Sequence, residues 1–305
     1  MLSALAPTCA FQAGPLLPAA AWARPPTLSR ARLAAARAPP AGVRVLHADP
    51  DVWLVNDLLT PDECSALRTL AEGRGFNASK PPAVSLDASR LWPLPLIAAA
   101  AGAPSGLHGG PDAWLAASAA AAALMCALAA GGLKVAERVA ASSLRTSSVA
   151  PLYDADCFAA VAPLVARADA LLGLDWGQLE CPAVTRYRAG ESFALHNDAS
   201  PTRGSEWAAS GGQRVATLIA YLNDVPEGGA TKFPKLGIEV KPERGAGLVF
   251  WPSLEGGAAD ERTVHEGAPA VDEKWICQVF ARERRAPPPL GLPDAFGAYA
   301  AGRGE

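Results

Sequence analysis

The sequence predicts a mainly β protein (α+β) in which a double-stranded β-helix, or jelly-roll, core is flanked by N-terminal helices. From residue 180 onward, short apolar segments alternate with turns rich in Gly and Pro. This spacing is typical of a double-sheet sandwich or jelly roll. Before residue 180, two stretches carry apolar residues at helical spacing. A length of 305 residues allows one large domain or two small ones.

The composition allows a sizeable core and points to no particular charged partner. Hydrophobic residues make up 50% of the chain and charged residues 19%, with a net charge of −3. This balance gives no electrostatic reason to expect nucleic acid as a partner. The six cysteines are widely scattered and form no C-x-x-C pair, which argues against a disulfide framework or a zinc site. We therefore expect buried free thiols.

The first 42 residues differ in composition from the rest of the chain. They contain no acidic residue and four arginines among alanine, proline and serine. Such a segment resembles an organellar transit peptide, or a signal segment followed by one. A disordered or mispredicted N-terminus is the open alternative. The arginine-rich start favours a plastid or a mitochondrion.

The ordered part of the chain is expected to begin at Val43. Apolar residues alternate from there to Leu59, which indicates one or two short strands. A helix should follow, because Thr60 can cap it, Pro61 suits its first position and Glu63 can complete a capping box.

An interruption of about residues 79–132 separates this helix from the rest of the domain. It is rich in alanine, glycine and proline, and residues 113–133 carry no charged side chain. We favour a poorly ordered insertion, which an error in the gene model could also produce. A helical decoration and a membrane span are the alternatives, but a span would separate the first helix from the later strands.

A second helix is expected over 154–172, where apolar residues recur on one side. The strands then follow closely, with turns at 189–190, 226–229, 241–245 and 255–258. Residues 286–305 are rich in proline, alanine and glycine. We therefore expect them to form a peripheral tail.

One histidine pair has the spacing of a metal site. His196 and Asp198 are separated by one residue, so on a strand their side chains point to the same face. His265 can join them only if the chain folds back. Two imidazoles and one carboxylate on one side of a metal suit Fe(II), with other positions left open. The pair His47 and Asp49 has the same spacing, but we interpret it as chance because no comparable strand and turn follow it.

Three further features follow the His196 pair in order. Residues 214–224 read as a strand that ends in a turn, residues 228–234 as a glycine turn that enters a strand, and Lys274 lies on an aromatic-rich strand. Together with the histidines, this set resembles the prolyl 4-hydroxylase branch of the 2-oxoglutarate- and Fe(II)-dependent dioxygenases. The resemblance covers about residues 43–285, with the oxygenase core at about 180–283.

The resemblance implies a cofactor set and its ligands. His196, Asp198 and His265 would hold Fe(2+), and 2-oxoglutarate, O2 and L-ascorbate would take part in the reaction. Lys274 would pair with the distal carboxylate of 2-oxoglutarate, since a cation deep in a barrel is costly unless matched. Hydroxyl donors to this co-substrate would come from Tyr187, Thr231 and Tyr221. The alternatives are a surface lysine and ordinary core tyrosines.

On the substrate side, the resemblance places Arg214 near a bound peptide, after a Gly- and Ser-rich loop at 199–212 that could order over a substrate. A solvated charge at a strand end is the alternative for Arg214. Arg145-Thr146-Ser147-Ser148 matches a segment near the active-site mouth of the family, or else is a polar strand edge.

Two departures from the family pattern fall on the co-substrate and substrate side. No glycine shortly precedes Lys274, and one residue fewer separates it from His265. Phe280 also stands where the family usually has tryptophan. These departures leave the iron ligands intact and put the substrate in doubt.

The predicted activity is hydroxylation of peptidyl proline at C4, with succinate and CO2 as co-products and a proline-containing peptide or protein as substrate. The alternatives are the same chemistry on another residue or a small molecule, and a non-catalytic binding module of the same fold. We expect neither nucleic acid nor a membrane as partner. The family is common in the secretory pathway and endoplasmic reticulum, and Asn77-Ala78-Ser79 is a candidate glycosylation acceptor.

Overall fold

The computed structural model describes residues 42–79, 145–201 and 208–302. The targeting segment predicted for residues 1–42 and the interruption predicted for about 79–132 therefore fall almost entirely outside the described residues. The chain divides into two compact units, one made of residues 1–79 and 147–305 and the other of residues 80–146. All the helices and strands of the described residues belong to the first unit.

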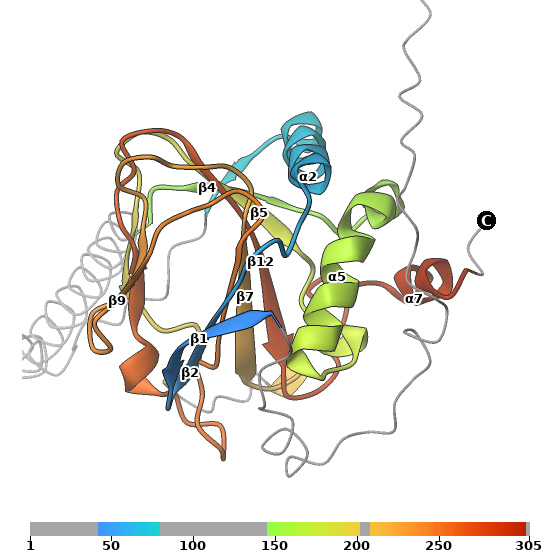
Figure 1. The fold of residues 1–305 in the computed structure, drawn as a ribbon. Helices are drawn as coiled ribbons and strands as arrows, with labels where there is room; N and C mark the ends of the chain where they lie inside the picture. The colour runs from blue at the N-terminus through green and yellow to red at the C-terminus, as the bar shows by residue number, and fades with distance from the viewer. Residues whose placement is uncertain (1–41, 80–144, 202–207, 303–305) are drawn as a thin grey trace, which may run out of the picture. The chain divides into compact units, whose positions relative to one another are not determined.

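Two antiparallel sheets form the core, which confirms the predicted jelly roll (Figure 1). The large sheet contains, in spatial order, β1 (Val43–Ala48), β2 (Asp51–Val55), β10 (Gly247–Phe250), β7 (Arg214–Tyr221), β12 (Lys274–Arg282), β5 (Ala183–Tyr187), β4 (Ser148–Pro151) and β3 (Asn77–Ala78). The small sheet contains β6 (Phe193–His196), β11 (His265–Gly267), β8 (Thr231–Phe233) and β9 (Ile238–Val240).

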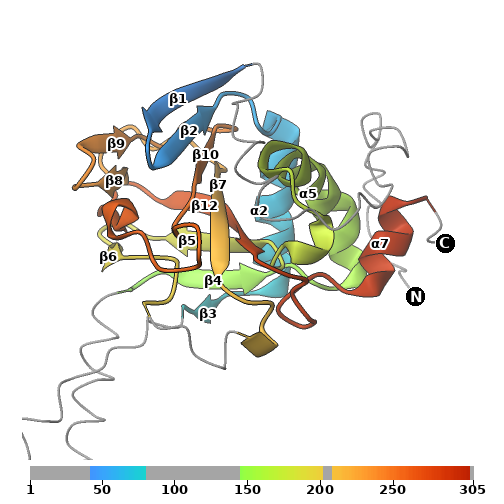
Figure 2. The ribbon, with the colours of Figure 1, turned by 90° about the horizontal axis from the view of Figure 1, so that it is seen from below.

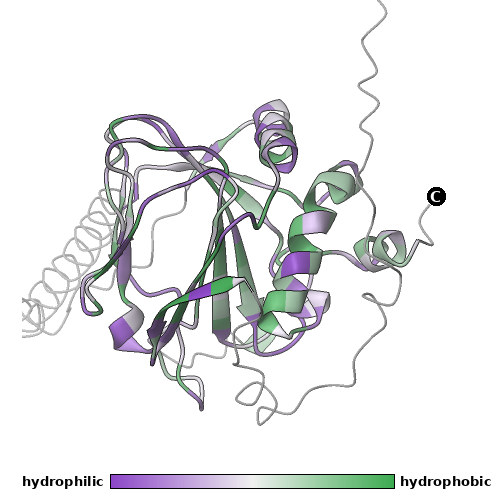
Figure 3. Cartoon of the chain, in the orientation of Figure 1, coloured by the Kyte–Doolittle hydropathy of each residue, from purple (hydrophilic) through white to green (hydrophobic). Residues whose placement is uncertain are grey.

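The central strands of the large sheet bury both of their faces. Side chains alternate between the faces of a strand, and on β7 the residues Leu218 and Ala220 belong to the core cluster that includes the helices. Ile219 and Tyr221 belong instead to a second cluster, which lies between the two sheets. Figure 3 shows hydrophobic colouring along these central strands. The sheet therefore has one face for the helices and one that lines an interior.

Two helices cover the outer face of the large sheet (Figures 1 and 2). Helix α2 (Pro61–Arg74) begins with the predicted capping box, in which Thr60 Oγ1 accepts from the Glu63 amide and the Glu63 carboxylate accepts from the Thr60 amide. The same carboxylate binds Arg167 of helix α5 (Phe158–Leu172) at 2.7 Å. The helix expected from residue 154 starts as a 3₁₀ turn, η3 (Ala155–Cys157), and becomes α-helical at Phe158.

The cysteines of the described residues are free and buried, as predicted; they are Cys64, Cys157, Cys181 and Cys277. Burial raises the pKa of Cys64 to about 11 and that of Cys181 to about 12. These thiols are therefore protonated at neutral pH and belong to the core. No helix within the described residues is long and apolar enough to cross a membrane.

The expectation of a peripheral tail is wrong for residues 286–302. Helix α7 (Asp294–Ala300) packs against α5, and Phe296 is fully buried. The ring of Phe296 lies 5.3 Å from that of Phe158 and 5.7 Å from that of Trp176, measured between ring centroids. The apolar residues of this segment stand singly among Pro, Gly and Ala. Their periodicity is therefore too weak to reveal a docked helix.

Replacement of Phe296 by Ala should lower the free energy of unfolding by about 3–5 kcal/mol, because it empties a buried aromatic site. Urea denaturation followed by circular dichroism measures the change. The matched control is Val271→Ala. Val271 is 59% exposed, so this substitution should lower the free energy of unfolding by less than about 0.5 kcal/mol. A Phe296 variant as stable as the control would show that the C-terminal segment is not part of the core.

Candidate metal centre

The three predicted ligands converge inside the jelly roll. His196 is the last residue of β6, and His265 is the first residue of β11. The antiparallel pairing of these strands places the two residues directly opposite each other. Their ring nitrogens and the carboxylate of Asp198 lie within 4.8 Å of one another. This is the only such group of three metal-binding side chains in the described part of the chain.

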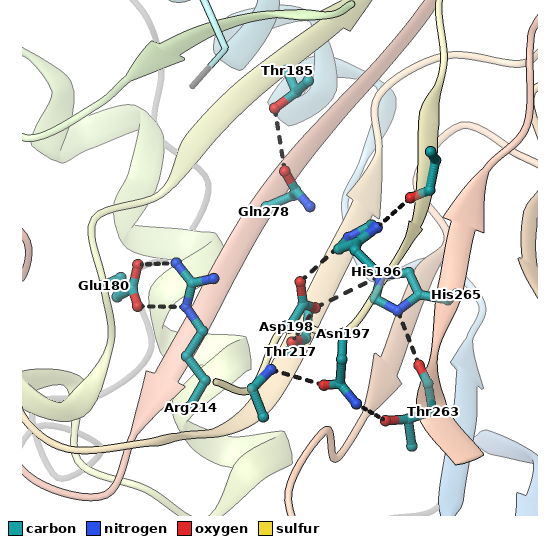
Figure 4. A network of polar contacts seen from close by, with 12 residues as sticks. Glu180, Thr185, His196, Asn197, Asp198, Arg214, Thr217, Thr263, His265 and Gln278 are labelled. Atoms are coloured by element: carbon teal, nitrogen blue, oxygen red, sulfur yellow. Dashed lines mark hydrogen bonds and ion pairs between the residues drawn. The ribbon is translucent and has the colours of Figure 1, made fainter. Parts of the chain in front are cut away.

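Backbone carbonyls orient both imidazoles (Figure 4). His196 Nδ1 lies 2.8 Å from the Ala194 carbonyl oxygen, and His265 Nδ1 lies 3.1 Å from that of Thr263. With Nδ1 donating to a carbonyl, each ring presents the lone pair of Nε2 to the centre. Burial and the neighbouring His196 lower the pKa of His265 to about 4. His265 is therefore neutral at pH 7, as a metal ligand must be.

Asp198 supplies the charge of the site. It is buried, and the hydroxyl of Thr217 on β7 donates to its Oδ2 at 2.8 Å. Burial would raise the pKa of this carboxyl, but the two histidines and the Arg214 guanidinium outweigh it and hold the pKa below its usual range. The carboxylate is therefore ionised at neutral pH and fixed in orientation.

The donor set fits a divalent metal. His196 Nε2 is buried and makes no hydrogen bond within the described residues, since its 3.6 Å separation from Asp198 Oδ1 is too long for one. A buried nitrogen of this kind normally has a partner, and a metal ion would provide it. Two neutral imidazoles and one carboxylate on one side are the ligands of the facial arrangement preferred by Fe(II).

Two supporting residues, Asn197 and Thr217, were not predicted from the sequence. Asn197, between the ligands, donates to the Asp260 carbonyl at 2.8 Å and accepts from the Ala199 amide at 2.8 Å. It therefore ties the turn after β6 to the segment before β11. Thr217 could have been found as an interior-facing polar residue two positions before Ile219 on a buried strand, but spacing alone does not connect it to Asp198.

The four residues predicted to bind 2-oxoglutarate gather at one end of the interior. Lys274 is 2% exposed, and its Nζ donates to the Gly229 carbonyl at 2.5 Å. Its ammonium lies 5.2 Å from the ring centroid of Tyr187 and 5.9 Å from that of Tyr221. The hydroxyl of Tyr221 donates to Thr231 at 2.9 Å. Burial lowers the pKa of Lys274 to about 7 and raises that of Tyr221.

Arg214 is not a solvated charge at a strand end. Its guanidinium makes two hydrogen bonds to Glu180, at 2.8 and 2.9 Å, and lies 3.6 Å from the ring centroid of Phe280 (Figure 4). Glu180 also accepts from Arg282 at 2.6 Å. The ion pair holds Arg214 in one orientation at the start of β7.

Two other candidate segments have local roles. Ser147 of the Arg-Thr-Ser-Ser segment is buried, with its hydroxyl 3.0 Å from that of Ser79, and Ser148 begins β4. These contacts support the alternative of a polar strand edge. In the chance pair, His47 Nδ1 contacts the Pro50 carbonyl at 2.8 Å in the turn between β1 and β2.

Comparison with known proteins supports the assignment. Residues 182–282 match the family model of the 2OG-Fe(II) oxygenase superfamily. The chain is 31% identical over 118 residues to "Probable prolyl 4-hydroxylase 9" of Arabidopsis thaliana, over 33% of this chain and 40% of that protein. It is 36% identical over 124 residues to prolyl 4-hydroxylase subunit alpha-1 of Homo sapiens, over 39% of this chain and 23% of that protein.

The matched segments therefore span less than half the length of these relatives. Among solved structures, the viral collagen prolyl hydroxylase of Paramecium Bursaria Chlorella virus-1, in its 2OG complex, aligns with a TM-score of 0.48 at 18% identity, over 75% of this chain and 94% of that one. The likeness in sequence to the 2OG-Fe(II) oxygenase superfamily therefore covers residues 182–282. The two relatives named above are both prolyl 4-hydroxylases, so the matched part of the chain is similar to that group.

Replacement of Asp198 by Ala should abolish tight metal binding, because it removes the only anionic ligand. The loss should exceed the roughly 10–100-fold that removal of an outer hydrogen-bond partner costs. Calorimetric titration with Mn(II) measures it. Asp49→Ala, in the pair with the same spacing, is the control and should bind as the wild type does. Equal affinities in the two variants would contradict the assigned site.

The affinity for 2-oxoglutarate should depend on pH through Lys274. The amino group of Lys274 is a cationic ammonium below its pKa of about 7 and a neutral amine above it. The dianionic co-substrate binds the cationic form of Lys274. Above pH 7 the lysine must therefore take up a proton when 2-oxoglutarate binds. The affinity should then fall by up to about tenfold per pH unit. Titrations between pH 6.5 and 9 measure it. Lys274→Arg remains charged throughout and should show a flatter profile, whereas a flat wild-type profile would contradict this role.

Proposed function

We propose that this protein is a Fe(II)- and 2-oxoglutarate-dependent dioxygenase that hydroxylates peptidyl proline at C4. One observation carries the proposal: a His-Asp-His group, buried at Asp198 and His265, and a buried lysine lie on the walls of the same interior. Lys274 has no acidic partner among the described residues, since its only hydrogen bond there goes to a carbonyl. A dicarboxylate that also reaches the metal satisfies both groups.

When bound, Fe(II) supplies the activation of O2, which is coupled to oxidative decarboxylation of 2-oxoglutarate to succinate and CO2. The protein's residues hold and orient the reactants. His196, Asp198 and His265 would hold the metal, and Lys274 would fix the distal carboxylate of the co-substrate. The hydroxyls of Tyr187, Thr231 and Tyr221 supply hydrogen bonds around it. L-ascorbate, typical of the enzymes this chain resembles, would return oxidised iron to Fe(II).

A proline-containing peptide or protein is the substrate class that the relatives favour, since both curated relatives are named as prolyl 4-hydroxylases. A peptide in an extended or polyproline-like conformation presents its proline without internal hydrogen bonds. Arg214, fixed by Glu180 and stacked on Phe280, begins β7. We infer that this guanidinium contacts the peptide.

A second enzymatic candidate is the same reaction on another residue or on a small molecule. The contact between the Arg214 guanidinium and the ring of Phe280 favours this alternative. The family usually has tryptophan at the position of Phe280, so the surroundings of Arg214 differ from those in the family. A non-catalytic binding module is less well supported, because all three metal ligands and the buried lysine are present.

Succinate formation tests the proposal. The protein would be incubated with Fe(II), 2-oxoglutarate and ascorbate, with and without a proline-rich peptide, beside Asp198→Ala. Succinate that rises with peptide, together with a product heavier by one oxygen atom at proline C4, is the expected result. Succinate that requires Asp198 but ignores the peptide would keep the oxygenase and remove this substrate. No succinate under any condition would favour the binding module.

Replacement of Arg214 by Ala should raise the KM for the peptide by about tenfold or more and leave the KM for 2-oxoglutarate near its wild-type value. A lost charge-assisted hydrogen bond has an effect of this size. Because Arg282 still pairs with Glu180, the variant leaves no unpaired buried carboxylate. Steady-state kinetics in each substrate measure the two constants. An increase in the KM for 2-oxoglutarate alone would contradict the peptide-contacting role.

A further inference from the structure

The interior also contains a buried glutamine, Gln278. Gln278 is 6% exposed and lies on β12. Side chains alternate along the strand, so Gln278 shares the interior face with Lys274 and Ile276, while Trp275 and Cys277 face the helices. An amide at this depth needs hydrogen-bond partners at both ends.

Only one end of the Gln278 amide is satisfied. Its Oε1 accepts from the hydroxyl of Thr185 on β5 at 3.3 Å. Its Nε2 donates to no group within the described residues and is not among their fully enclosed unpaired atoms, so it borders open space in the interior. Figure 4 shows the oxygen turned to Thr185 and the nitrogen turned toward the side on which His196 lies. Thr185 therefore fixes the amide so that its N–H groups point into the site.

The strand register places Gln278 between the metal ligands and Lys274. Phe280 pairs with Thr217, and the hydroxyl of Thr217 donates to the metal ligand Asp198. The metal site therefore lies beside this residue pair of the large sheet. Gln278 pairs with Ile219, two residues away in the direction of Lys274, which is about 7 Å along a strand. A molecule that spans from the metal to Lys274 must pass Gln278.

We propose that Gln278 donates a hydrogen bond from Nε2 to the carboxylate at the keto-acid end of 2-oxoglutarate, and so positions the co-substrate. The inference rests on the proposed function. An amide N–H donates its strongest hydrogen bonds to a charged oxygen. The distal carboxylate is already matched by Lys274 and its neighbouring hydroxyls. The peptide is a poorer acceptor, because Gln278 lies on the Lys274 side of the metal level and Arg214 lies on the other.

Three substitutions separate this role from a structural one. Gln278→Met keeps the size and removes the donor, and it should raise the Kd for 2-oxoglutarate by about tenfold. Gln278→Glu still accepts from Thr185 but replaces the donor with a negative charge, so it should weaken binding further. Thr185→Val releases the amide and should have a smaller effect. If Gln278 only anchored Thr185, Gln278→Glu would bind 2-oxoglutarate about as well as the wild type, and Gln278→Met and Thr185→Val would weaken binding to a similar extent.

The full-length protein loaded with Mn(II) would be titrated with 2-oxoglutarate by calorimetry. The Mn(II) affinity and the Tm of each variant serve as controls and should remain near the wild-type values. The expected order of Kd is wild type, then Thr185→Val, then Gln278→Met, then Gln278→Glu. Peptide-dependent turnover should show the same order in the KM for 2-oxoglutarate.

Three results would overturn the proposal. If the wild type binds 2-oxoglutarate and all variants bind equally well, the role of Gln278 fails while the proposed function stands. If the variants change only the KM for the peptide, Gln278 serves the substrate instead. If the wild type binds no 2-oxoglutarate with Mn(II) present, the proposed function fails together with this inference.

Discussion

The antiparallel pairing of β6 with β11 is the constraint on which the site depends. It brings His265 opposite His196, although the two residues lie 69 positions apart in the sequence. Asp198 completes the group from the turn after β6, and Thr217 of the large sheet fixes it. A slip of one residue in either strand would turn a ligand to the opposite face. The register of the two strands therefore sets the geometry of the metal site.

The two faces of β7 and β12 explain why such a polar site is compatible with a stable core. One face packs against α2 and α5, and the other lines the interior. The buried charged side chains differ in whether a side chain of opposite charge binds them. Glu180 is bound by Arg214 and Arg282, and removal of a partner from such a group is costly. Among the described residues, the ammonium of Lys274 has a carbonyl and two tyrosine rings as neighbours but no carboxylate, which leaves its charge for a ligand.

Local sequence patterns predicted much of this structure. The capping box at Thr60, the strand turns and the spacing of His196 and Asp198 depend on neighbouring residues, so they are visible in the sequence. Contacts between distant single residues are not. Gln278 meets Thr185 across 93 positions, and neither belongs to a recognisable motif. Phe296 was missed for a similar reason, because the proline-rich segment around it hides the helix that carries it.

The central claim is that the three ligands and the lysine bind Fe(II) and 2-oxoglutarate as one unit. It is tested most directly by visible absorption of the protein under anaerobic conditions. A keto acid chelated to Fe(II) gives a charge-transfer band, so the account predicts a band that requires both Fe(II) and 2-oxoglutarate and is absent in Asp198→Ala. Absence of this band from the wild-type protein at saturating Fe(II) and 2-oxoglutarate would contradict it.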